Sequence, residues 1–188
     1  MEGKLPVPVN PARISVIVGK NGKNKKKIEE GFKIKLEIDS KDSIVYVVPI
    51  EGITPFHVMK AKQAIEAISL GFSVEDALLL TDDMMYLEVM DLTDVTRNKK
   101  DLERIKARVI GSGGRFKKTI EEMTGTRIVV SEKKIGIIGD YEQVKLARET
   151  IEMIISGKSH QTALNHLKIG SRRLKRRRIE LWEKWGSI

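Results

Sequence analysis

Two short glycine loops carry the residues of this sequence that are best suited to chemistry. Gly19-Lys20-Asn21-Gly22 and Gly111-Ser112-Gly113-Gly114 each follow an aliphatic pair and precede a basic residue. A backbone without Cβ atoms can approach an anion closely, and amide groups at the start of a following helix favour negative charge. The chemistry that such loops could perform is the binding of phosphate groups.

Basic side chains stand beside both loops. They are Lys20, Lys23 and Lys25 at the first loop and Arg115, Lys117 and Lys118 at the second. Because such side chains neutralise phosphates, we expect the affinity for a flexible polyanion to fall as the salt concentration rises. The expected fall is roughly 0.7 log unit per tenfold increase in salt for each contact.

A third basic cluster lies near the C-terminus, where every residue of 172–178 except Leu174 is arginine or lysine. One interpretation is a flexible, solvated tail. The other is an ordered helix, because Leu174, Leu181, Trp182 and Trp185 fall on one helical face. Such a helix would pack its tryptophans on a domain and present arginines to a polyanion. The candidate contacts are Arg172, Arg173, Arg176 and Arg177.

Several kinds of enzyme site find no support. The chain has no cysteine, which excludes disulfides, thiol chemistry and cysteine-ligated zinc. His57, His160 and His166 have no metal-binding spacing, and Asp82-Asp83 lack a third acid nearby, so we expect no metal site. The glycine loops match neither the nucleotide P-loop nor the dinucleotide pattern. A nucleotide-dependent enzyme would bind ATP or NAD in a titration, but we expect no cofactor and no catalysis.

Composition and charge indicate a soluble protein with a polyanionic partner. The 188 residues, of which 40% are hydrophobic, are enough for two small domains with packed cores. The net charge is +9, and an acidic stretch at residues 72–97 separates two basic blocks. No apolar run approaches the roughly 18–20 residues of a membrane span, and residues 1–6 have no signal-peptide core. We therefore expect a cytoplasmic protein.

The two loops belong to an internal repeat. With Gly19 placed on Gly111, Ile28-Glu29-Glu30 falls on Ile120-Glu121-Glu122, and Lys35-Leu36 falls on Arg127-Ile128. After a length change, Ala61 to Glu66 matches Ala147 to Glu152, and Gly71 matches Gly157. Two matching stretches with one length change between them predict two copies of the same fold.

Each copy has the same predicted order of elements. In the second copy, residues 87–92 alternate as a strand, and 98–110 form a basic helix that the glycines interrupt. A short helix at 115–123, strands at 126–131 and 134–138, and a helix at 141–156 follow. The predicted order is β-α-α-β-β-α.

This order, with a Gly-x-x-Gly turn between the first two helices, resembles the KH RNA-binding domain. The resemblance predicts an α+β chain of two tandem KH domains, each with an extra C-terminal helix, followed by a basic helical tail. We expect the domains at residues 1–82 and 83–170 and the tail at 171–188.

A KH domain clamps about four nucleotides of single-stranded RNA between the glycine loop and a strand edge. The bases need an apolar floor, for which Ile17, Val18, Ile28 and Leu36 are candidates in the first copy, and Val109, Ile110, Ile120 and Ile128 in the second. Plain core packing is the alternative for any of them. Base edges would be read by Lys35, Arg127 or the strand backbone.

Two KH domains followed by an arginine-rich tail with a tryptophan pair resemble the small-subunit pre-ribosomal RNA processing factors of archaea and eukaryotes. This resemblance covers nearly the whole chain. It implies binding near the 3′ end of small-subunit ribosomal RNA during ribosome assembly. It also implies a Nob-type endonuclease and the α subunit of translation initiation factor two as partners. The alternative function is a KH-type mRNA-binding regulator.

Overall fold

The computed structural model describes residues 3–185, with the backbone alone for residues 181, 182, 184 and 185. The first copy consists of β1 (Leu5–Pro8), α1 (Ile14–Val18), α2 (Lys23–Phe32), β2 (Ile34–Asp39), β3 (Ile44–Pro49), α3 (Pro55–Leu70) and α4 (Val74–Leu78). The second copy consists of β4 (Tyr86–Asp91), α5 (Lys99–Ile110), α6 (Arg115–Thr124), β5 (Arg127–Val130), β6 (Lys134–Gly139), α7 (Tyr141–Ile155) and α8 (His160–Trp185).

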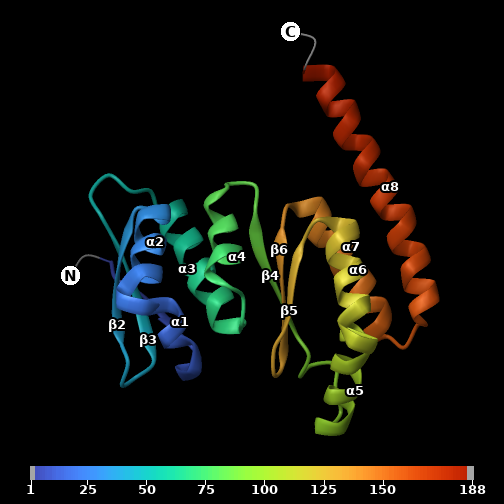
Figure 1. The fold of residues 1–188 in the computed structure, drawn as a ribbon, viewed down its shortest axis with the longest axis horizontal. Coiled ribbons are helices and arrows are strands. Elements are labelled where there is room, and N and C mark those ends of the chain that lie inside the picture. Colours follow the sequence, from blue (N-terminus) through green and yellow to red (C-terminus); the bar gives the residue numbers. More distant parts are fainter. Residues whose placement is uncertain (1–2, 186–188) are drawn as a thin grey trace.

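Each copy builds one three-stranded antiparallel sheet. The strand orders are β1-β3-β2 and β4-β6-β5, so the strand that follows the glycine loop and its helix is an edge strand in both copies. The helices of each copy cover one face of its own sheet (Figure 1). The predicted α+β fold and its order of elements are confirmed.

Alternating side chains explain which face of each strand is buried. In β2 and β3, Ile34, Leu36, Val45 and Val47 are almost fully buried beneath the helices, while the residues between them are more exposed. This period of two is the pattern of a strand with one face on a core. A separate core lies under the helices of the second copy.

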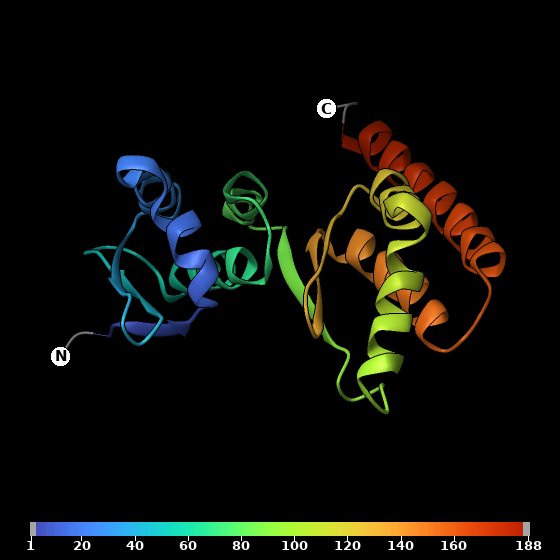
Figure 2. The same ribbon diagram turned by 60° about the horizontal axis from the view of Figure 1, so that its bottom comes forward.

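Helix α3 lies between the two sheets. Ala61, Ala64, Ala67, Ile65 and Ile68 are all 0% exposed, and they lie on more than one side of the helix. The polar side chains Lys62, Gln63 and Glu66 occupy the remaining, partly exposed side, so α3 has a wide apolar face that can contact two sheets. On one side α3 covers its own sheet, and on the other α3 and α4 face the second sheet (Figures 1 and 2).

The two copies pack together where glycines of each copy leave room for side chains of the other. A Cβ atom on Gly136 of β6 would lie 2.7 Å from Cε2 of Phe72, and one on Gly71 would lie 3.1 Å from Cγ1 of Val129. Leu87 and Ile138 of the second sheet join the core of the first copy. The glycine at position 136 therefore lets the Phe72 ring sit directly against the sheet.

A buried lysine holds the segment that links the copies. The ammonium group of Lys60, on α3, donates to the carbonyl oxygens of Asp82, Asp83 and Met85, and it lies 5.3 Å from the centre of the Phe56 ring. Burial lowers the pKa of Lys60, with the Asp83 and Asp82 carboxylates opposing that effect. The acidic stretch thus includes a structured linker between the two copies.

The C-terminal region differs from the prediction in one respect. The extra helix of the second copy and the basic tail form a single helix, α8, of 26 residues. The boundary expected at residue 171 therefore lies inside a continuous helix. The predicted packing of Trp182 and Trp185 on a domain lies outside the described side chains.

The predicted bounds of the elements differ from the observed ones by one or two residues at most. Asn98 is the N-cap of α5, and its side chain accepts a hydrogen bond from the amide of Asp101. Among residues 3–185, no helix is both long enough and apolar enough to cross a membrane.

Candidate nucleic-acid interface

The two glycine loops have the same backbone conformation. Gly19, Asn21 and Gly22 have φ angles of 70°, 54° and 74°, and the matching residues of the second loop have 75°, 60° and 74°. Positive φ is costly for most residues with a side chain, and asparagine tolerates it better than most. Each copy therefore contains the same turn, built from glycine and one asparagine at positive φ, and the turn presents its backbone at the protein surface.

The first glycine of each loop is required by close packing. A Cβ atom on Gly19 would lie 2.6 Å from Cγ of Asn24, and one on Gly111 would lie 2.5 Å from Cβ of Phe116. A Cβ atom on Gly22 or Gly114 would meet nothing within 4 Å. The space beside the last glycine is therefore open, and a ligand can approach the backbone there.

Helices α2 and α6 begin directly after the loops. Their N-cap residues, Gly22 and Gly114, have no side chain that could bond the first amide groups. The first amides of a helix have no partner within the helix and attract anions. The amides of Lys23 and Arg115 donate to the carbonyl oxygens of Lys20 and Ser112 in their own loops, so a phosphate would meet the amides that follow, which no side chain of the N-cap residue bonds.

The predicted basic residues do lie around the loops, but some are engaged by glutamates. Ion pairs one helical turn apart join Lys25 to Glu29 at 3.8 Å, Lys117 to Glu121 at 2.9 Å and Lys118 to Glu122 at 3.7 Å. Lys118 and Glu122 are exposed, and exposed pairs at this spacing contribute only about 0.3–0.5 kcal/mol, so a phosphate can displace this pair. The other two pairs are partly buried.

Three further basic side chains can meet a phosphate without first leaving a glutamate. Lys20, Lys23 and Arg115 are exposed, and none forms an ion pair with another described residue. Arg115 donates from Nε to the carbonyl oxygen of Ser112, at 3.2 Å, and this contact folds it back over its loop. Each loop thus has at least one cation available to a ligand.

A glutamate from each second helix holds the edge strand. In the first copy, the amide of Leu36 donates to Oε1 of Glu29 at 2.8 Å, so this amide faces away from β3. Residues of an antiparallel strand alternate between facing the partner strand and facing away. Two residues on, the amide and carbonyl groups of Ile38 therefore also face the open edge.

The second copy repeats this arrangement. The amide of Ile128 donates to Oε1 of Glu121, also at 2.8 Å, which leaves the amide and carbonyl groups of Val130 at the open edge. The neighbouring amide donor and carbonyl acceptor of such a residue can pair with an acceptor and a donor on the edge of a base. The sequence predicted the strand backbone as a base contact but not the two glutamates that hold it. Glu29 and Glu121 occupy equivalent positions in the repeat, and this equivalence could have indicated their role.

The predicted apolar floor must be corrected. Ile17 is 0% exposed, and Leu36 and Ile128 are 2% exposed, because all three side chains point into the cores beneath the helices. Ile28, Val109 and Ile120 are buried as well. Of the predicted floor residues, only Val18 and Ile110, which directly precede the loops, are partly exposed.

The two residues predicted to read base edges have different surroundings. Lys35 is exposed on the free face of the first sheet. Its counterpart Arg127 lies between the copies, where Nε donates to Oδ1 of Asp76 at 3.1 Å. Arg127 is thus part of the contact between the domains, and reading a base would require it to leave Asp76.

One backbone carbonyl before each loop is held by different side chains in the two copies. In the first copy, Nδ2 of Asn24 donates to the carbonyl oxygen of Val16 at 2.8 Å. In the second copy, Nε2 of His160 lies 2.8 Å from the carbonyl oxygen of Arg108, and its ring packs edge-on against Phe116. His160 therefore ties the start of α8 to the second loop.

Metal ligands are not gathered anywhere in the described part of the chain. Among residues 3–185, no three histidine, aspartate or glutamate side chains come together as a metal site would require. The arrangement of loops, helix starts and strand edges is suited to binding a polyanion.

Comparisons with known proteins agree with this geometry. A model of the KH domain matches residues 4–67, and a model of the eukaryotic-type KH domain, KH-domain type I, matches residues 86–172. The chain is 37% identical to the KH domain-containing protein MJ0443 of Methanocaldococcus jannaschii, over 94% of the chain and 78% of that protein. It is 31% identical to the pre-rRNA-processing protein PNO1 of Coccidioides immitis, over 91% of the chain and 68% of that protein.

A solved structure is similar over almost the same length. It is the a/eIF2alpha-aDim2p-rRNA complex from Pyrococcus horikoshii, matched with a TM-score of 0.85 and 34% identity over 91% of this chain and 95% of that one. The chain belongs to the Dim2p/PNO1 family. Members of this family are RNA-binding pre-rRNA-processing factors and not enzymes. The family resemblance and the two KH domains predicted from the sequence are confirmed, although the chain spans less than half the length of some other PNO1 proteins that it matches.

Proposed function

We propose that both glycine loops bind single-stranded RNA, each with about four nucleotides. The observation that carries this proposal is the identical geometry of the two copies: the same positive φ angles, the same uncapped helix starts and the same glutamate-held strand edge. Phosphates would meet the loop amides and the basic residues Lys20, Lys23 and Arg115. Bases would meet the edges at Ile38 and Val130.

The RNA that we propose as the ligand is the 3′ region of small-subunit ribosomal RNA, bound during pre-rRNA processing in the cytoplasm. Family membership supports a ribosomal substrate, and the relative from Pyrococcus horikoshii has been solved together with rRNA and a/eIF2alpha. We extend both partners to this chain, together with a Nob-type endonuclease that would make the final cut. A KH-type mRNA-binding regulator would show no preference for the ribosomal strand.

The experiment is a binding titration with a short strand from the 3′ end of small-subunit ribosomal RNA and a scrambled control of equal length. The wild type is compared with two variants, Lys20→Asp/Asn21→Asp and Ser112→Asp/Gly113→Asp, which place negative charge where phosphate would lie. We expect the ribosomal strand to bind more tightly, and each variant to lose affinity. Equal binding of both strands, unchanged in the variants, would contradict the proposal.

A further inference from the structure

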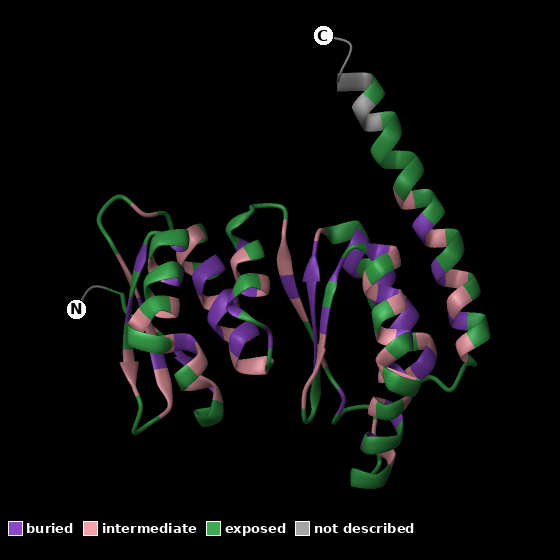
Figure 3. Cartoon of the chain, viewed as in Figure 1, coloured by how far each residue is buried: buried purple, intermediate pink, exposed green. Residues whose placement is uncertain are grey.

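Helix α8 continues beyond the helix that supports it. Ala163 and Leu167 are 0% exposed and Ser171 is 4% exposed where α8 packs on α7 and α6, and the hydroxyl of Ser171 donates to the carbonyl oxygen of Met123 at 2.8 Å. After Leu174, every described side chain from 175 to 180 is exposed. Figure 3 shows this change as the helix leaves the body of the protein.

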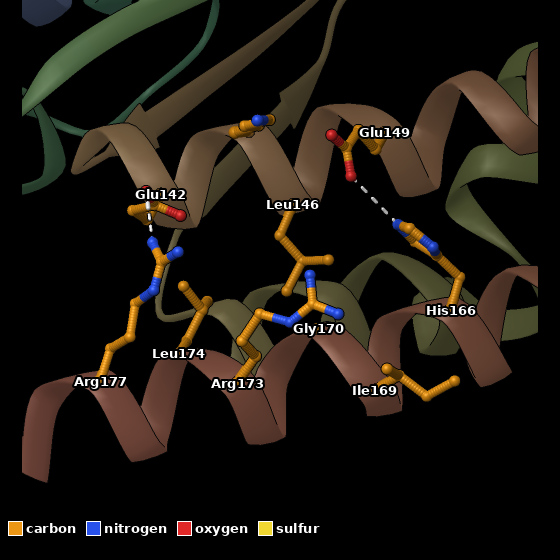
Figure 4. Close-up of a pocket in the computed structure, with 10 residues that line it drawn as sticks. Glu142, Leu146, Glu149, His166, Ile169, Gly170, Arg173, Leu174 and Arg177 are labelled. Atoms are coloured by element: carbon orange, nitrogen blue, oxygen red, sulfur yellow. Dashed lines mark hydrogen bonds and ion pairs between the residues drawn. The ribbon is translucent and has the colours of Figure 1, made fainter.

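Between residues 172 and 178, three of the five arginines form no ion pair with a described acidic residue. Arg177 reaches Glu142, in the first turn of α7, at 2.9 Å (Figure 4). Arg178 lies 3.8 Å from Asp140, the N-cap residue of α7. The others are exposed and form no ion pair with another described residue. These are Arg172, Arg173, Lys175 and Arg176.

This distribution of charge opposes helix formation in the free protein. Arg172 and Arg176 are four residues apart, as are Arg173 and Arg177, and like charges at this spacing repel each other. A polyanion bound along the helix would remove that repulsion. Uncompensated arginines on a straight, solvent-exposed helix are the expected property of a phosphate-binding surface.

The arginine surface lies outside the proposed KH site. His160, at the start of α8, contacts the carbonyl oxygen of Arg108 beside the second loop. Arg172 follows twelve residues later, which places it roughly 18 Å further along the helix axis. A KH domain holds only about four nucleotides, so the strand in the second loop does not account for these arginines.

We infer that Arg172, Arg173 and Arg176 on α8 bind the phosphate backbone of a double-stranded RNA segment that adjoins the strand held by the KH domains. A single strand exposes its bases, and the arginine-rich helix α8 has no open strand edge of the kind that Ile38 and Val130 would offer to them. A duplex stacks its bases inside and presents phosphates and 2′-hydroxyls, which arginines contact without reading the sequence. The inference rests on the proposed function for the adjoining strand.

The test uses the full chain and four RNAs. They are a six-nucleotide single strand, a blunt hairpin, the same hairpin carrying the six nucleotides, and the six nucleotides extended by unpaired uridines to the hairpin's length. The variant is Arg172→Gln/Arg176→Gln, which keeps helix propensity. Lys99→Gln/Lys100→Gln removes the same charge from exposed lysines at the start of α5 and serves as the control.

We expect the wild type to bind the hairpin-bearing strand about tenfold more tightly than the six nucleotides alone. We also expect the α8 variant to lose this gain, with a slope of log affinity against log salt lower by about 2, while the lysine control keeps the gain. Binding of the six nucleotides should be unchanged in the α8 variant.

Three outcomes would overturn the inference: an undiminished gain in the α8 variant, an equal gain from the uridine extension, or equal loss of six-nucleotide binding. If the six nucleotides fail to bind the wild type but the blunt hairpin binds through α8, the KH proposal fails, and only the duplex binding by α8 stands, without the adjoining strand. Circular dichroism of each variant checks that α8 is still folded.

Discussion

Replacing Asn21 by aspartate adds one negative charge to the tip of the first loop with almost no change of shape. The Asn21 side chain is exposed, and its φ angle of 54° is one that aspartate tolerates as asparagine does. The fold of the loop should therefore be preserved. If a phosphate lies against this loop, the new carboxylate must weaken its binding.

The size of the effect follows from Coulomb's law. At an assumed separation of about 5 Å, two unit charges repel by roughly 0.8 kcal/mol in water and by about 3 kcal/mol at the dielectric constant near a protein surface. We therefore expect Asn21→Asp to weaken RNA binding by about 4- to 150-fold. Higher salt should shrink the difference, because exposed charges are screened.

Fluorescence anisotropy with a labelled six-nucleotide RNA at low salt measures this change. Asn165→Asp on α8 is the matched control, since it makes the same chemical change at another exposed asparagine. At the second loop, Gly113 has open space and a φ angle of 60°, so Gly113→Asn and Gly113→Asp form an equivalent pair that differs in charge alone. Equal affinities of the wild type and Asn21→Asp, together with equal affinities of Gly113→Asn and Gly113→Asp, would refute the placement of phosphate at the loops.

Three further predictions concern the contact between the copies and the linker. Gly136→Val should push against Phe72 and lower the free energy of unfolding by about 1–3 kcal/mol in a urea titration, and an unchanged midpoint would contradict the packing described above. Lys60→Met should cost about 1–3 kcal/mol because it leaves linker carbonyls without a donor, whereas Lys62→Met, which breaks only a partly exposed pair with Glu66, should cost less than about 1 kcal/mol. Because burial lowers the pKa of Lys60, the unfolded chain binds more protons than the folded chain between that lowered pKa and 10.5, so the free energy of unfolding should rise with pH in this window, and Lys60→Met should remove that rise.

The local features of this chain could be predicted from the sequence because local physics determines them. A glycine loop between a helix and a basic segment forms the same turn in both copies, and its neighbours in sequence include the residues that shape it, such as Asn24 and Phe116. The repeat then places an equivalent strand edge beside each loop. The fold and the position of the candidate site therefore followed from residues close to one another in the chain.

Long-range packing decided the features that the sequence did not reveal. An aliphatic residue beside a loop can face the core or a ligand, and only the assembled core shows that Ile17 and Leu36 are buried. Lys35 and Arg127 align in the repeat, but Arg127 is drawn to Asp76 of the other copy. The repeat implies equal surroundings for equivalent residues, and the contact between the copies breaks that equality.

The contact between the copies also explains why α7 and α8 of the second copy have a different role from α3 and α4 of the first. Leu70 and Phe72 of the first copy pack against the second sheet, but the residues at the matching positions are Ser156 and Lys158, both exposed. A serine and a lysine cannot bury the face of another sheet. Within residues 3–185, no further sheet packs on α7 and α8, and α8 extends into solvent with its arginines exposed. One helix pair thus provides a protein contact, and its equivalent provides charge for a polyanion.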